Sequence, residues 1–120
     1  SKQKLEGTLM IKTLKHPESY KLVLGFGDQL LHMKEGVRHL QSVYPGASVY
    51  ACIYEDGSII FSRDTNEINL AVLGKAFGGG GRESGAGGFL PKGLTAKVGY
   101  RETTSHHVLE IIEEALSNIS

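Results

Sequence analysis

The sequence predicts one α/β domain: a mixed β-sheet of about five strands with two to three packed helices and a glycine-rich loop. Three observations support this class. The 120 residues are 40% hydrophobic and 22% charged, which is typical of a single globular domain and not of a disordered chain. Several short runs alternate apolar and polar residues with the period of a strand, and others repeat apolar residues with the period of a helix. Glycine, proline and aspartate mark the turns between these runs.

The strand-like runs lie mostly in the first half of the chain. Residues 7–14 and 20–26 alternate apolar and polar side chains, and we expect them to pair as a hairpin. Residues 47–64 carry the strongest hairpin signal, because two β-rich runs flank an Asp-Gly turn. Both of these runs are largely apolar, so we place this hairpin at the centre of the sheet. Residues 95–101 are the predicted final strand.

Three segments have helical periodicity. Residues 28–43 and residues 105–118 place apolar side chains at spacings of three and four, which predicts two amphipathic helices. Residues 69–77 predict a shorter helix with clear end signals. Asn69 is a good N-cap, and Gly78 stands where a residue with positive φ ends many helices.

Charge balance and cysteine content narrow the function classes. Thirteen basic and thirteen acidic residues give a net charge of zero, which argues against a strongly basic nucleic-acid binder but permits a local basic site. Cys52 is the single cysteine and lies in an apolar run, so we expect a buried structural thiol. No apolar run approaches the ~20 residues of a membrane helix, and we expect a protein of the reducing cytoplasm.

The most unusual feature is residues 77–90, which hold seven of the 16 glycines. A run of glycines is costly in conformational entropy unless the backbone needs it, so a flexible linker and an ordered loop are the competing interpretations. Phe77 precedes the run, and Phe89 and Leu90 follow it. Because these apolar side chains favour the core, we expect an ordered loop that is pinned on both sides.

Within this loop the residue types suit an anion. Consecutive glycines expose backbone N–H groups, Arg82 adds a guanidinium, and Ser84 adds a hydroxyl. The segment RESGAGG could also begin a short helical turn, whose N-terminus favours negative charge. The spacing fits neither the P-loop nor the dinucleotide-binding fingerprint. A phosphate site and a purely structural turn therefore both stay open at this point.

The stretch IIFSRDTNEINLAVLGKAFGGGGRESGAGGF, residues 59–89, resembles the C-terminal, substrate-binding domain of the DHH (Asp-His-His) family of phosphoesterases. That family includes RecJ-like exonucleases and enzymes that degrade very short RNAs. The family pattern is a strand that delivers an arginine, a short helix and a glycine-rich loop with a basic residue. The matching positions here are Arg63, residues 69–77, residues 78–81, Arg82, Ala86 and Gly87.

The resemblance implies that the chain binds the phosphate and terminal nucleotide of a short nucleic acid or a phosphorylated nucleotide. The substrate-binding residues would be Arg63, Gly79, Gly80, Gly81, Arg82 and Ser84. In the family, a separate N-terminal domain carries catalysis and holds divalent metals, with Mn²⁺ expected. We therefore expect residues 1–120 to be a C-terminal-type domain with no catalytic residue, metal or cofactor of its own. It is either part of a longer phosphoesterase, which we favour, or a free-standing relative that binds without cleaving.

Several positions depart from the family pattern. Arg82 replaces the usual loop histidine, which keeps a positive charge but cannot switch protonation. Asp64 replaces the usual serine after the strand arginine, and we expect it to offset Arg63 partly; Gly85 replaces one of the paired alanines. No Asp-His-His triplet occurs, and the three aspartates are scattered. The alternative function is a non-catalytic interaction or dimerisation module with a structural glycine turn, for example in a homodimer.

Overall fold

The computed structural model describes residues 10–13, 20–27 and 35–117. They form a six-stranded sheet in the order β1-β2-β3-β4-β6-β5. The strands are β1 (Met10–Thr13), β2 (Lys21–Gly27), β3 (Val49–Tyr54), β4 (Ser58–Ser62), β5 (Gly80–Arg82) and β6 (Gly85–Phe89). β2 and β3 run parallel, and all other neighbours are antiparallel, so the predicted mixed sheet is confirmed.

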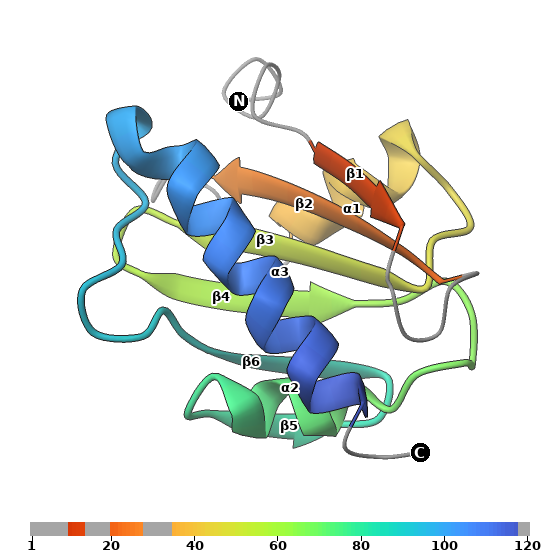
Figure 1. Cartoon of the computed structure of the whole chain (residues 1–120). Coiled ribbons are helices and arrows are strands. Elements are labelled where there is room, and N and C mark those ends of the chain that lie inside the picture. The colour runs from red at the N-terminus through yellow and green to blue at the C-terminus, as the bar shows by residue number, and fades with distance from the viewer. Residues whose placement is uncertain (1–9, 14–19, 28–34, 118–120) are drawn as a thin grey trace.

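Helices cover both faces of this sheet (Figure 1). The helices are α1 (Glu35–Val43), α2 (Leu70–Ala76) and α3 (Arg101–Ser117), and a 3₁₀ turn, Val98–Tyr100, precedes α3. α3 crosses the front of the sheet and packs with α2, whereas α1 lies behind β2 and β3. α2 and β5 lie together at the lower edge in this view.

The two faces of the sheet bury separate hydrophobic clusters. The larger cluster fills the space under α2 and α3 and includes Leu24, Phe61, Leu73 and Ile112. The smaller one packs under α1 and includes Val37, Leu40 and Cys52. Cys52 is fully buried, so the predicted structural thiol is confirmed.

Most of the elements expected from the sequence are present. The β1–β2 and β3–β4 hairpin pairings are confirmed, and β3 and β4 lie at the centre of the sheet. The side chain of Asn69 accepts a hydrogen bond from the Ala71 N–H, and Gly78 has φ +74°, so both end signals of α2 act as predicted. The first part of the predicted helix 28–43 lies outside the described residues, and its remainder is α1.

The predicted final strand, residues 95–101, is wrong. Residues 98–100 form the 3₁₀ turn, and α3 begins at Arg101, four residues before the predicted start. The hydroxyl of Thr104 donates to the Thr95 carbonyl at 2.7 Å, and the Arg101 Nε donates to the Ala96 carbonyl at 3.1 Å. These bonds tie the segment to α3, and the short alternating pattern is overridden because tertiary contacts outweigh local β propensity.

The glycine-rich segment is a β-hairpin and not a loop. β5 and β6 pair through Gly80↔Gly87 and Arg82↔Gly85, so the helical turn expected from RESGAGG is wrong. Phe77 is buried as expected, but Phe89 is 62% exposed, so only one of the two phenylalanines that bracket the run faces the core. Two of the six strands of the sheet, β5 and β6, come from this segment, which composition alone assigns to a loop.

Candidate functional site

The glycines allow the β5–β6 hairpin to lie directly against α2. A Cβ atom added at Gly74 of α2 would come 2.7 Å from the Gly80 carbonyl oxygen. One added at Gly88 would come 2.6 Å from the Phe77 carbonyl oxygen. One added at Gly79 would overlap the backbone of β6, 2.7 Å from the Gly88 Cα. Side chains at Gly74 or Gly88 would separate α2 from the hairpin, and one at Gly79 would push the segment after α2 away from β6, so backbone contact explains much of the glycine content.

Arg82 is the last residue of β5, and Ser84 lies in the turn of this hairpin. Both border a pocket of about 690 Å³. That volume is within the ~300–1,000 Å³ of typical ligand sites. The pocket lies between α1 and the hairpin, across β4. Its lining residues are Val37, Arg38, Gln41, Ile60, Phe61, Ser62, Gly81, Arg82, Ser84, Gly85 and Ala86.

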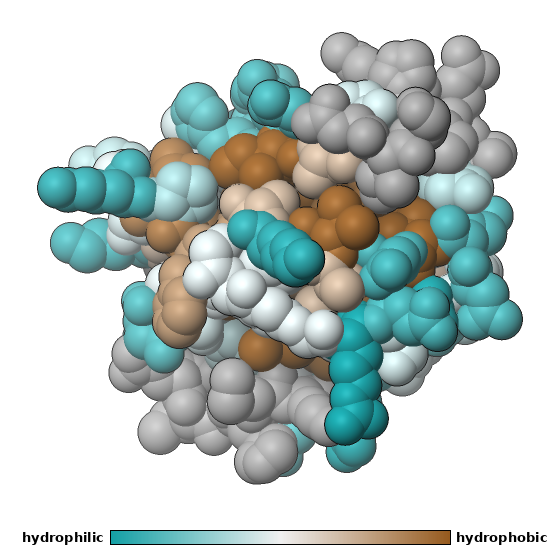
Figure 2. Space-filling view, turned by 90° about the horizontal axis from the view of Figure 1, so that it is seen from below, coloured by the Kyte–Doolittle hydropathy of each residue, from teal (hydrophilic) through white to brown (hydrophobic). Residues whose placement is uncertain are grey.

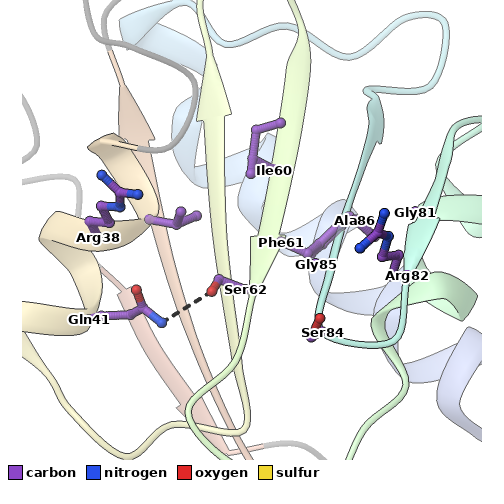
Figure 3. A pocket seen from close by; sticks show the side chains of 11 residues that line it. Arg38, Gln41, Ile60, Phe61, Ser62, Gly81, Arg82, Ser84, Gly85 and Ala86 are labelled. Atoms are coloured by element: carbon purple, nitrogen blue, oxygen red, sulfur yellow. Dashed lines mark hydrogen bonds between the residues drawn. The ribbon is translucent and has the colours of Figure 1, made fainter.

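Two arginines lie on opposite sides of this pocket. Figure 3 shows Arg38 on α1 at one side and Arg82 on the hairpin at the other, with β4 between them. Among the lining residues these two are the ionisable ones, so the pocket carries two positive charges in a domain whose net charge is zero. Within the described part of the chain neither guanidinium has a hydrogen bond or an ion pair. No described residue therefore occupies their donors.

A hydrogen-bond network holds the polar wall below Arg38. The Gln41 amide Nε2 donates to Ser62 Oγ at 3.1 Å and to Asp64 Oδ1 at 3.0 Å. Asp64 Oδ2 in turn accepts from the Gly46 N–H at 2.8 Å and from the Tyr50 hydroxyl at 2.7 Å. Burial alone would raise the pKa of Asp64, but these hydrogen bonds outweigh it and lower the pKa below its ordinary value.

The structure brings only some of the predicted binding residues together. Gly81, Arg82 and Ser84 line the pocket, whereas Gly79 and Gly80 do not. The Gly79 N–H already donates to the Gly74 carbonyl at 2.8 Å, and Gly80 pairs with Gly87 in the hairpin. The run is thus a strand at the sheet edge and not an open nest of free donors.

Arg63 is not among the lining residues, so the structure does not place it with Arg82 in this pocket. Its guanidinium donates to the Ile68 carbonyl at 2.7 Å and so stabilises the segment that leads into α2. Because successive residues of a strand point to opposite faces, Ser62 enters the pocket and the next residue turns away from it. Asp64 serves the Gln41 network, not Arg63 as the sequence suggested.

Sequence reasoning missed Arg38, Gln41 and Ser62. Arg38 and Gln41 are three residues apart on α1, next to its buried stripe, and such pairs share one side of a helix. The spacing was visible in the sequence, but nothing local indicated which strand that side of the helix would meet.

The open face of β6 extends the pocket toward an exposed aromatic ring. Gly87 pairs with Ile60, which lines the pocket, and Phe89 pairs with Ser58. Paired residues share a face, so Phe89 lies on the pocket side, four residues or roughly 13 Å along the strand from Gly85.

Figure 2 views the molecule from the side of β5 and α2, where pale residues of intermediate hydropathy lie between hydrophobic patches and projecting hydrophilic side chains.

The described ranges contain neither a cluster of metal-ligating side chains nor a membrane-spanning helix. Residues 10–13, 20–27 and 35–117 contain no group of three or more His, Cys, Asp or Glu residues placed to hold a metal ion. No helix in these ranges has both the length and the apolar character needed to cross a membrane.

Comparisons with known proteins identify the fold but no family. No protein-family model matches the sequence, and no curated protein matches it significantly. An uncharacterized protein from Helicobacter pylori G27 has a similar structure, with a TM-score of 0.52 and 18% identity over 80% of this chain and 26% of that chain. PggH, a pGpG-specific phosphodiesterase from Vibrio cholerae, has a TM-score of 0.54 and 12% identity over 95% of this chain and 38% of that chain. The chain thus spans well under half the length of either protein.

Proposed function

We propose that this chain is the substrate-binding domain of a phosphoesterase of the DHH type. It would bind the phosphate and terminal nucleotide of a short nucleic acid or a phosphorylated nucleotide. The observation that carries the proposal is that Arg38 and Arg82, neither of which has a partner among the described residues, line one pocket of a domain with a net charge of zero. The structural likeness to a phosphodiesterase, PggH, supports the same class of ligand.

The pocket has the donors that a phosphate needs. A guanidinium presents its N–H groups in a planar fork that matches two phosphate oxygens, and a hydroxyl can serve a third. Arg82 and Ser84 lie together at the hairpin end of the pocket (Figure 3), and Arg38 faces them. A hydrogen bond to a charged group contributes about 1.5–3 kcal/mol, so each arginine should matter measurably.

Phe89 supports a ligand that includes a base. Its ring is 62% exposed on the pocket side of β6, where burial does not explain an aromatic residue. Bases stack on such rings with a contribution of roughly 1–3 kcal/mol, whatever their sequence. A phosphate at Arg82 and a base on Phe89 would together span a short oligonucleotide.

The hydrolytic chemistry would come from a separate domain. In this proposal an N-terminal DHH domain holds the divalent metals, Mn²⁺ in the first instance, and the present domain delivers the substrate phosphate to them. The chain covers 38% of PggH, so a protein of that size has room for a second domain.

The test is calorimetric titration of the domain with a 5′-phosphorylated ribodinucleotide at fixed, moderate salt. We expect Arg82→Ala to weaken binding about 10- to 100-fold and Arg38→Ala to weaken it about 10-fold. Arg82→Lys should recover only part of the loss, because lysine has no bidentate fork. Lys75→Ala is the matched control, since this exposed lysine on α2 carries the same charge and lies outside the pocket.

Equal affinity of the wild type and the Arg38→Ala/Arg82→Ala double variant would overturn the proposal. That result would favour the alternative, a protein interaction or dimerisation module. The exposed side chains of Val43, Phe89 and Tyr100 are the observation behind this alternative. Sedimentation of the wild type and of Phe89→Ser would then distinguish self-association from binding to another protein.

A further inference from the structure

We propose that Gln41, oriented by Asp64, determines which ligands the pocket accepts. Its amide oxygen offers a hydrogen-bond acceptor on the side of the pocket that carries Arg38. The ligand would therefore carry an N–H or O–H donor next to its phosphate, as a nucleotide does and an inorganic polyphosphate does not. This inference rests on the proposed function for the phosphate half of the ligand.

Asp64 fixes the orientation of the Gln41 amide. An ionised carboxylate only accepts hydrogen bonds, so the atom of Gln41 that lies 3.0 Å from Asp64 Oδ1 has to be the NH₂ nitrogen. Asp64 cannot rotate freely to change this, because the Gly46 N–H and the Tyr50 hydroxyl hold its other oxygen at 2.8 and 2.7 Å. The carboxylate thus fixes which end of the amide faces the network.

Both hydrogens of the Gln41 amide nitrogen have a partner. An amide NH₂ group has two hydrogens, and here one points to Asp64 Oδ1 and the other to Ser62 Oγ. The Gln41 Oε1 is left without a partner in the described part of the chain. Figure 3 shows this oxygen directed away from Ser62, on the side of the pocket that also carries Arg38.

The arrangement of donors and acceptors around the pocket limits which ligand groups can face Gln41. Arg82 and Ser84 present donors at the hairpin side, whereas the α1 side presents both the donors of Arg38 and the acceptor of Gln41. A phosphate oxygen facing Gln41 Oε1 would place two acceptors together, which is unfavourable. A base N–H or the ribose 2′-hydroxyl would instead complete the hydrogen bond. Asp64 does not itself line the pocket, so it is a positioning residue that acts through Gln41.

The experiment compares four probes by calorimetric titration: guanosine 5′-monophosphate, its 2′-deoxy form, purine riboside 5′-monophosphate, whose base has no N–H donor, and inorganic pyrophosphate. For the wild type we expect guanosine monophosphate to bind about 3- to 10-fold more tightly than at least one of the two nucleotide analogues. The weaker analogue identifies the donor as base N–H or ribose hydroxyl.

Two variants separate the roles of the residues. Gln41→Met keeps the length of the side chain and removes the acceptor, so the preference among nucleotides should disappear while pyrophosphate affinity stays within about 2-fold.

Asp64→Asn should reverse the orientation of the Gln41 amide. The Gly46 N–H still requires an oxygen, so the new NH₂ group would face Gln41 and turn its amide around. The pocket would then gain a donor, and pyrophosphate affinity should rise about 3- to 10-fold.

The outcomes distinguish the two proposals. Wild-type binding of pyrophosphate with equal affinity for all three nucleotides would leave the phosphate site standing and overturn the role of Gln41. Unchanged preference in Gln41→Met would overturn it too, and that variant carries the test if Asp64→Asn does not fold. Failure of all four probes to bind would overturn both the inference and the proposed function.

Discussion

The close backbone contact between Gly79, just past the end of α2, and β6 predicts a large difference between two neighbouring glycines. We consider Gly79→Ala and Gly80→Ala, two substitutions that add the same methyl group to adjacent residues. At Gly79 the new Cβ would overlap the Gly87 carbonyl and lie 2.7 Å from the Gly88 Cα. At Gly80 it would meet nothing within 4 Å. Neither glycine has a positive φ, so backbone conformation does not separate the two cases.

The expected magnitude follows from what would have to move. The three nearest neighbours of the Gly79 methyl are backbone atoms of β6, so no side chain can rotate away, and residue 79 and β6 have to move apart. That shift would also strain the Gly79 N–H bond to the Gly74 carbonyl, now 2.8 Å. Forced overpacking costs about 1–3 kcal/mol, and we expect Gly79→Ala to lie near the upper end, about 3 kcal/mol. Gly80→Ala should change stability by less than ~1 kcal/mol and could raise it, because alanine restricts the unfolded chain.

The assay is urea unfolding followed by far-ultraviolet circular dichroism, with thermal melts as a second measurement. At roughly 4 °C per kcal/mol for a domain of this size, Gly79→Ala should lower Tm by about 12 °C. Gly80→Ala is the matched control. If the two variants unfold within ~0.5 kcal/mol of each other, residue 79 does not pack against β6 by backbone contact, and the explanation of the glycine run is wrong.

Two further predictions concern single buried or partly buried groups. Burial raises the pKa of the Cys52 thiol to about 12, so the native thiol should resist disulfide reagents at pH 8, and the free energy of unfolding should fall as the pH rises from the unfolded value of about 8.5 toward 12. Rapid labelling without denaturant would contradict this. Arg63→Met should lose about 1–2 kcal/mol of stability, because the bond to the Ile68 carbonyl is lost, but leave dinucleotide affinity within about 2-fold. A loss of affinity as large as that of Arg82→Ala would instead restore the shared site that the sequence suggested.

The elements that could be predicted have strong local signals. The short helix α2 has an asparagine at its start and a glycine just past its end, and both act within a few residues of the chain. The β3–β4 hairpin has an Asp-Gly turn between two apolar runs. The β5–β6 hairpin lacks such signals, since glycine has poor β propensity. Its strands exist because β4 and α2 offer them a partner and a surface, and neither lies next to them in the sequence.

The candidate site was predictable only in part, for a related reason. Arg82 and Ser84 stand in the glycine-rich segment, so the motif drew attention to them. Arg38 stands in no motif, and its place opposite Arg82 depends on α1 packing beside β4. The motif predicts Arg63 as a site residue. Because successive residues of a strand point to opposite faces, Arg63 and Ser62 cannot both point into the pocket.

The parallel pairing of β2 and β3 has a consequence for when the pocket exists during folding. Parallel neighbours need a crossover, and the described part of that connection includes α1, which carries Arg38. Arg82 comes from β5, the edge strand, which β4 and β6 separate from β3. The pocket is therefore assembled from contacts of long sequence separation, which form late and are lost when the sheet comes apart. A ligand held by both arginines would stabilise the whole domain against cooperative unfolding and would have little affinity for partly folded chains.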